Sequence, residues 1–93
     1  MPTNERRRAQ IAAAVAAYDR ANPLAPLPHN ATRLLIVMFP VDDVCERSWR
    51  DIACDGFGRS RVYSTLRRLI RAGLLSWQKP ALYRLHLPAE VAP

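Results

Sequence analysis

Five arginines lie close together in the C-terminal half of this 93-residue chain, between Arg59 and Arg71. Each guanidinium carries a fixed positive charge and a planar fork of donors that matches a phosphate or the edge of a guanine. From residue 56 to residue 89 there are seven basic residues and no acidic one. This stretch therefore has the chemistry to bind a polyanion.

The residues just before this stretch have the opposite charge. Between Pro40 and Asp55, five acidic residues outnumber two arginines, although the whole chain has a net charge of +6. Asp42, Asp43 and Glu46 are accompanied by no phosphate-binding glycine loop and no nucleophile motif, so we do not expect a catalytic carboxylate pair. We expect acidic partners to be drawn to the C-terminal half, and we predict no enzymatic activity.

An amphipathic helix from Arg59 to Ala72 is predicted to position the arginines. Its apolar residues recur at the helical spacing i, i+4, i+7 and i+8: Val62, Leu66, Leu69 and Ile70. At 100° per residue, Ser60, Ser64, Arg67 and Arg71 fall near the opposite side, with Arg68 beside them. Gly73 is predicted to end this helix.

A shorter helix and a hairpin are expected on either side of it. Ser48 to Asp51 resembles a capping box and predicts a helix from Trp49 to about Cys54, followed by a turn at residues 55–58. After Gly73 the pattern alternates, which predicts two strands joined around Pro80. The large aromatic residues Trp49, Trp77 and Tyr83 are expected in the core, although base stacking is the alternative.

The N-terminal part is expected to form a helix from Asn4, as its N-cap, to Ala21. Its narrow apolar stripe lies outside the rest of the predicted core and makes a homodimer possible: Ile11, Val15 and Tyr18. The basic run Arg6 to Arg8 is either a minor-groove arm or the soluble beginning of the helix, and the second interpretation is favoured.

Three prolines between Pro23 and Pro28 predict an extended spacer. A second helix is then expected from Ala31 to about Phe39, with Asn30 as N-cap and Pro40 closing it, and a buried strand is the alternative. We divide the chain into a possible dimerisation helix (1–22), a proline-rich linker (23–30), the main domain (31–88) and a tail (89–93).

The order helix, short helix, turn, second helix, glycine and hairpin resembles the winged helix-turn-helix superfamily of bacterial and phage transcription regulators. The similarity is carried by Ser48–Ala53, Gly56–Tyr63, Leu66–Leu75 and Tyr83–Leu85, within Ala31–Leu87. It implies an α+β fold, mainly helical with a small β-hairpin, preceded here by an extra N-terminal helix. It also implies that Arg59–Ala72 enters the major groove of double-stranded DNA.

Helix geometry divides the polar residues by role, because the first turns of a recognition helix face base edges and later residues reach the backbone. The candidates for reading bases are Arg59, Ser60, Arg61, Tyr63 and Ser64. The candidates for phosphate contact are Arg50, Arg67, Arg68, Arg71, Lys79 and Arg84.

We therefore expect a sequence-specific double-stranded DNA-binding protein, a repressor-like regulator without a cofactor. The alternative is a winged-helix adaptor or inhibitor whose basic face binds an acidic protein. No apolar run is long enough to span a bilayer, and no secretory signal is recognised, so a cytoplasmic location is expected. Cys45 and Cys54 are expected to be free thiols, and no zinc site is expected from them with His29 and His86.

Overall fold

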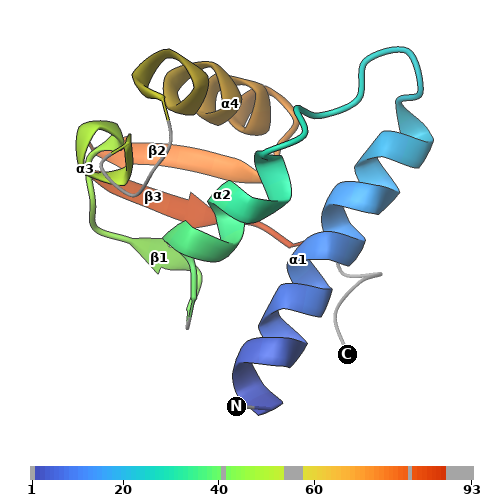
Figure 1. The fold of residues 1–93 in the computed structure, drawn as a ribbon, viewed down its shortest axis with the longest axis horizontal. Coiled ribbons are helices and arrows are strands. Elements are labelled where there is room, and N and C mark those ends of the chain that lie inside the picture. Colours follow the sequence, from blue (N-terminus) through green and yellow to red (C-terminus); the bar gives the residue numbers. More distant parts are fainter. Residues whose placement is uncertain (1, 41, 54–57, 80, 88–93) are drawn as a thin grey trace.

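The computed structural model describes residues 2–40, 42–53, 58–79 and 81–87. Over these residues it is a mixed α+β structure of four helices and a three-stranded antiparallel sheet, which confirms the expected class at this level (Figure 1). The elements in chain order are α1 (Pro2–Ala21), α2 (Ala31–Met38), β1 (Val44–Cys45), α3 (Trp49–Ala53), α4 (Arg59–Arg71), β2 (Leu75–Lys79) and β3 (Leu82–Leu85).

The sheet has the order β1-β3-β2, with both neighbours of β3 antiparallel to it. The predicted hairpin is present, with Leu75 opposite Leu85 and Trp77 opposite Tyr83. The sequence-based prediction missed β1, which pairs Val44 with Arg84. This strand of two residues is too short for an alternating pattern to reveal it.

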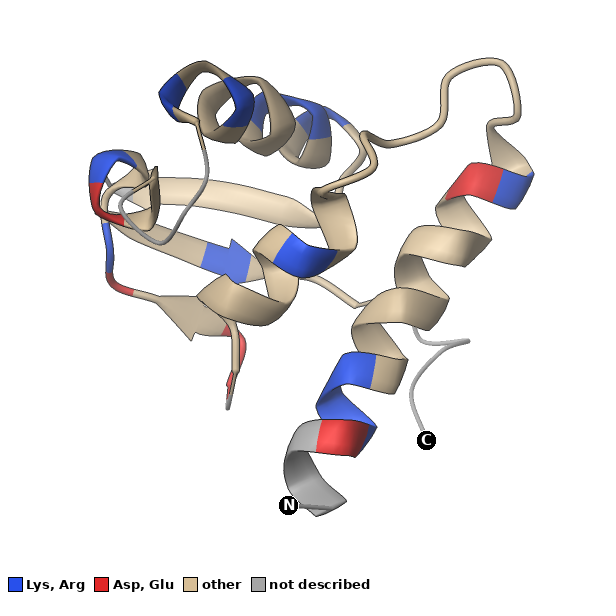
Figure 2. Cartoon of the chain, viewed as in Figure 1, with Lys and Arg blue, Asp and Glu red and all other residues tan. Residues whose placement is uncertain are grey.

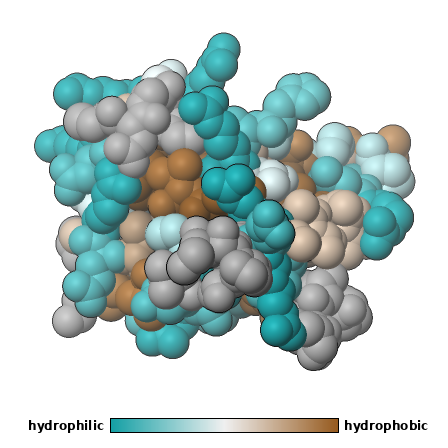
Figure 3. All heavy atoms as spheres, turned by 60° about the horizontal axis from the view of Figure 1, so that its bottom comes forward, coloured by the Kyte–Doolittle hydropathy of each residue, from teal (hydrophilic) through white to brown (hydrophobic). Residues whose placement is uncertain are grey.

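One hydrophobic core joins the helices to the sheet. α4 contributes Val62, Leu66 and Leu69, and α2 contributes Leu34 and Leu35, all of them buried. Because Ala31–Met38 forms the helix α2, the helix prediction for residues 31–39 is confirmed against the strand alternative. On the face that Figure 3 brings forward, hydrophilic side chains cover most of the surface and apolar atoms gather near its centre.

The helix α1 belongs to the same core, which corrects two expectations. Ile11 and Val15 are buried in this chain's own core and Tyr18 packs against it, so the stripe is not left free for a second copy. α1 lies beside α2 and contacts it (Figure 1). Since α1 begins at Pro2, Asn4 lies inside the helix and is not its N-cap.

The proline-rich linker is likewise fastened to the domain and is not an extended spacer. Leu27 is buried in the core, and its backbone N–H donates to Asp19 Oδ1 at 2.9 Å. A turn at its beginning is closed by the Ala25 N–H, which donates to the Asn22 carbonyl at 3.1 Å. α1, the linker and the following elements therefore fold together.

Arg7 has an internal role that neither interpretation of the N-terminal arginines predicted. Its Nε donates to the Phe39 carbonyl at 3.2 Å, and its Nη2 contacts the Asp42 carbonyl and pairs with the Asp43 carboxylate. Its side chain is only 13% exposed. Arg7 therefore fastens α1 to the segment that follows α2.

The predicted glycine end of α4 is confirmed. Gly73 has a φ of +84°, the left-handed region that a side chain disfavours. The Gly73 N–H donates to the Ile70 carbonyl and the Leu74 N–H to the Leu69 carbonyl, each at 3.1 Å. These two bonds form a Schellman motif, which turns the chain from α4 into β2.

Within the described residues, no helix combines the length and the apolar character that crossing a membrane requires.

Candidate nucleic-acid interface

α4 separates its apolar and cationic residues by side. Val62, Thr65, Leu66 and Leu69 are buried against the core. The opposite side is exposed and includes all five candidates for reading bases and two candidates for phosphate contact: Arg59, Ser60, Arg61, Tyr63, Ser64, Arg67 and Arg71. Figure 2 shows basic residues along this helix and no acidic ones. The structure thus brings most of the predicted site onto one surface.

The beginning of α4 adds a positive electrostatic end to this surface. Gly58 is its N-cap in an extended conformation and provides no side-chain hydrogen bond, and the first turn has no acidic residue. Backbone N–H groups at a helix N-terminus attract anions. Arg59 and Arg61 therefore stand on the part of the helix where the backbone also favours negative charge. The predicted turn at residues 55–58 falls mainly outside the described residues.

A part-buried hydrogen bond joins α4 to the N-cap residue of α2. Thr65 Oγ1 donates to Asn30 Oδ1 at 2.9 Å. Asn30 does occupy the N-cap position of α2, as predicted, but its side chain makes no capping bond. The sequence did not reveal this pair. Thr65 is a polar residue type, but its position in α4 places it among the buried apolar residues.

The exposed side of α4 forms a ridge between two hollows. One hollow of about 540 Å³ lies beside Ser60, Arg61 and Ser64 and reaches the linker at Pro28 and His29. On the other flank a pocket of about 410 Å³ includes Tyr63, Arg67 and Arg71. The candidates for reading bases are therefore divided between two flanks of one helix.

Arg68 has a partner within the chain, and its role as a phosphate contact stays a prediction. Its Nη2 donates to the Pro26 carbonyl at 2.6 Å, and the side chain is half-buried. Arg67 has a weaker internal contact, in which Nη1 donates to the Tyr63 hydroxyl at 3.3 Å. This bond holds the Arg67 guanidinium near the hydroxyl edge of Tyr63. The guanidinium carbon lies 5.8 Å from the centroid of the Tyr63 ring.

Arg50 is connected to α4 through aromatic rings. Its guanidinium carbon lies 5.5 Å from the centroid of the Trp49 ring. Trp49 in turn meets Tyr63 of α4 edge to face, with ring centroids 5.7 Å apart. The first turn of α3 is thus held beside the exposed side of α4.

The hairpin carries two further candidates for phosphate contact, Lys79 and Arg84. Tyr83 and Leu85 are buried on the sheet face toward α4, and strand alternation places the exposed Arg84 on the opposite face. The role of Arg84 as a phosphate contact made by the hairpin stays a prediction. The side chain of Lys79 lies outside the described part of the structure.

Trp77 differs from its expected place in the core. Tyr83 is 3% exposed and Trp49 is partly buried against the core, but Trp77 is 55% exposed. The rings of Trp77 and Tyr83 are stacked, with centroids 6.4 Å apart and planes inclined by 14°. Alternation correctly put Trp77 on the face of Leu75, but it did not reveal that the core ends before Trp77.

Burial shifts two titratable groups in the sheet. It raises the pKa of the Cys45 thiol, and it also raises the pKa of the Tyr83 hydroxyl. Both shifts favour the neutral form, because a buried charge is poorly solvated. Cys45 is a buried free thiol, while Cys54 lies outside the described residues.

The acidic connector has structural contacts. Asp43 pairs with Arg7, and Asp42 Oδ1 accepts the Val44 N–H at 3.1 Å. Among the residues that the structure describes, no group of three or more His, Cys, Asp or Glu is arranged to hold a metal ion. Comparisons with protein-family models, curated proteins and solved structures found no match for this chain.

Proposed function

We propose that this protein is a winged helix-turn-helix regulator that binds double-stranded DNA with α4. The order α2, α3, α4 and hairpin agrees with that fold. The observation that carries the proposal is the exposed side of α4, where arginines are present without a carboxylate while the other side is buried in the core. A surface helix that served solubility alone would normally carry both signs of charge.

The geometry supports a division between base and phosphate contacts. A helix of this diameter fits the major groove of B-DNA. Arg59 and Arg61, in the first turn, would donate two hydrogen bonds each to guanine. Arg67 and Arg71, further along, would neutralise phosphates, with Arg50 contributing from α3. By occupying its binding site on DNA, such a protein would act as a repressor-like regulator.

The internal bond of Arg68 and the position of Arg84 reduce the expected number of phosphate contacts. Three to four contacts per chain predict that log Kd changes with log salt with a slope of about 3 to 4 in magnitude. A titration of duplex binding between low and physiological salt measures this slope.

The proposal is tested by selection from a library of random duplexes. We expect the protein to enrich a defined motif, and the double variant Arg67→Glu/Arg71→Glu to recover no DNA above background. The matched control, Arg6→Glu/Arg8→Glu, makes the same charge change at two exposed residues of α1 and should recover the same motif.

Two outcomes would overturn the proposal. Equal loss in both double variants would indicate attraction by net charge alone. Failure of the unaltered protein to enrich any duplex would leave the adaptor function, in which the same basic surface binds an acidic protein.

A further inference from the structure

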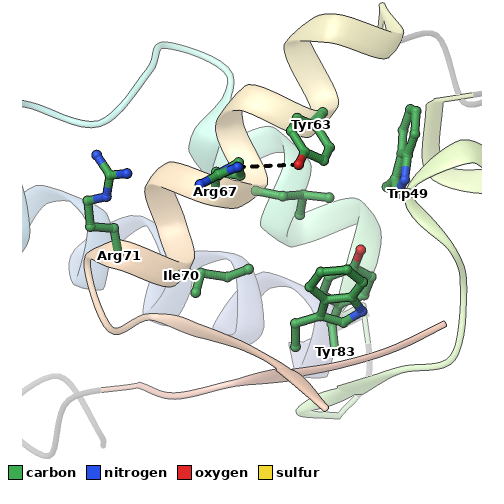
Figure 4. A pocket seen from close by; sticks show the side chains of 8 residues that line it. Trp49, Tyr63, Arg67, Ile70, Arg71 and Tyr83 are labelled. Carbon is green, nitrogen blue, oxygen red and sulfur yellow. Dashed lines mark hydrogen bonds between the residues drawn. The ribbon is translucent and has the colours of Figure 1, made fainter. Parts of the chain in front are cut away.

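A pocket of about 410 Å³ lies between α3, α4 and the hairpin. Aromatic and aliphatic side chains provide most of its lining: Trp49, Tyr63, Leu66, Ile70, Trp77 and Tyr83 (Figure 4). Its volume is within the range of sites that bind small organic molecules. The pocket brings four aromatic rings together from α3, α4, β2 and β3.

Two of these four aromatic rings are largely exposed to solvent. Tyr83 and Leu66 are buried at 3% exposure each and belong to the core. Trp77 and Tyr63 are 55% and 45% exposed, so they present large apolar surfaces at the pocket. A planar ring placed against these two side chains would remove apolar area from water and gain stacking contacts.

The charge of the pocket restricts the kind of ligand. Arg67 and Arg71 line it from successive turns of α4, and no carboxylate is among the described residues of its lining. In Figure 4, Arg67 lies between Tyr63 and Arg71. Its present partner, the Tyr63 hydroxyl, is neutral and 3.3 Å away, a weaker contact than a guanidinium makes with a carboxylate.

We propose that this pocket binds a small planar aromatic carboxylate. The ring lies against Trp77 and Tyr63, and the carboxylate accepts hydrogen bonds from Arg67, with Arg71 adding its charge. A neutral aromatic molecule fills the same apolar space but leaves both guanidiniums without an anionic partner. The acid is therefore preferred over a neutral molecule of the same shape.

Ligand binding has a consequence for DNA, and this consequence rests on the function proposed above. Arg67 and Arg71 are also the phosphate contacts of α4, so a bound carboxylate competes with the DNA backbone for the same guanidiniums. By linkage, the ligand weakens DNA binding by the same factor by which DNA weakens ligand binding. The pocket is thus the site of an effector that releases the DNA.

The binding test needs no DNA, because the chain has only two tryptophans and both line the pocket. Two-dimensional NMR of the nitrogen-labelled protein gives one indole signal for each, and Trp77→Phe assigns them. We expect 2-naphthoate to shift both signals in a saturable manner. The neutral amide of the same shape, 2-naphthamide, should bind about tenfold more weakly.

Charge variants identify the arginines as the cause of this preference. In Arg67→Gln/Arg71→Gln, naphthoate should bind no better than naphthamide binds to the unaltered protein. The control Arg6→Gln/Arg8→Gln loses the same charge on α1 and should keep the tenfold preference. Absence of saturable shifts, equal binding of acid and amide, or an equal loss in both double variants overturns the proposal.

A competition experiment separates this proposal from the proposed function. If the DNA motif is found, adding saturating naphthoate should reduce duplex affinity by about tenfold, the factor expected from losing one charge-assisted contact. Saturable naphthoate binding in a protein that enriches no duplex would support the pocket and overturn only the DNA function. DNA binding without any response of the indole signals to naphthoate would support the DNA function and overturn the pocket proposal.

Discussion

α1 and α4 are the two helices with clustered arginines, yet they use them in opposite ways. In α1, Arg7 is largely covered and satisfied by groups of the same chain. In α4, most arginines stay exposed, and only Arg68 is bound to a backbone carbonyl of the linker. The two sets are indistinguishable in charge and residue type.

The difference comes from what the fold brings near each helix. The segment after α2 supplies the Asp43 carboxylate and the Phe39 carbonyl to α1. α4 has no acidic residue of its own, and the acidic Asp42 and Asp43 are engaged elsewhere. A run of arginines is therefore a binding surface only when the fold leaves its guanidiniums exposed to the partner.

The largest expected effect tests whether α1 belongs to the core. Ile11→Ala should lower the free energy of unfolding by about 2–5 kcal/mol, because it leaves a cavity among packed side chains. Ile11 is fully buried between α1 and its neighbours. Urea unfolding followed by circular dichroism measures the loss.

An exposed leucine provides the control for this variant. Leu24 is 99% exposed in the linker, so Leu24→Ala should change stability by less than about 0.5 kcal/mol. If the cost of Ile11→Ala depended on protein concentration, the stripe of α1 would instead lie between copies of the chain.

The next effect tests whether Arg7 of α1 stabilises the fold, in contrast to the exposed arginines of α4. Arg7→Gln should cost about 1–2 kcal/mol of stability, a value reduced from that of a buried charged contact because Asp43 is half exposed. Arg8→Gln, at an exposed position of the same run, should cost less than about 0.5 kcal/mol. Equal costs in thermal or urea unfolding would show that the position of Arg7 has no special value.

A smaller effect concerns the way α4 ends. Gly73→Ala should destabilise the protein by about 1 kcal/mol, because alanine is strained at a φ of +84°. Gly73→Asn is the matched control at the same position, because asparagine tolerates the left-handed region better than alanine does. It should cost less stability than Gly73→Ala, and an equal cost for both variants would contradict the explanation from backbone strain.

The smallest effect distinguishes the sheet from both helices at alkaline pH. Arginines stay charged there, so their contacts do not change. Cys45 and Tyr83 have pKa values raised by burial, so the folded protein retains their protons more strongly than the unfolded chain. The resulting stabilisation is complete below pH 9.0, the ordinary value for a thiol, and is lost as the pH rises through the folded pKa values.

Urea unfolding measured from about pH 8 to about pH 11 tests this direction. The free energy of unfolding should fall with rising pH. In Cys45→Ala it should fall less steeply, because this variant retains only the contribution of Tyr83. A stability that does not change over this range would contradict the expected shifts.

The sequence was sufficient for elements whose residues repeat strongly. The spacing of Val62, Leu66 and Leu69 predicted α4 and its exposed side, and Gly73 marked its end. Alternation predicted the hairpin that follows. In these cases a local pattern and the final burial agree, so the chain carries the information within a few turns or residues.

Contacts between distant segments were not predictable in this way. β1 depends on pairing with β3 about 40 residues later in the chain. The partners of Arg7 are 32 to 36 positions away, and the bond from Arg68 to Pro26 spans 42. Such contacts are made when the core assembles, and neither charge runs nor prolines specify them locally.

The irregular pairing between β2 and β3 has a consequence for the protein in concentrated solution. β2 is an outer strand of the sheet and carries the exposed Trp77, a combination that invites strand-to-strand aggregation. The register shifts between Trp77 and Lys79, which interrupts the straight edge that another chain would need as a template. This irregularity in the ladder thus makes the β2 edge a poorer template for pairing with another chain.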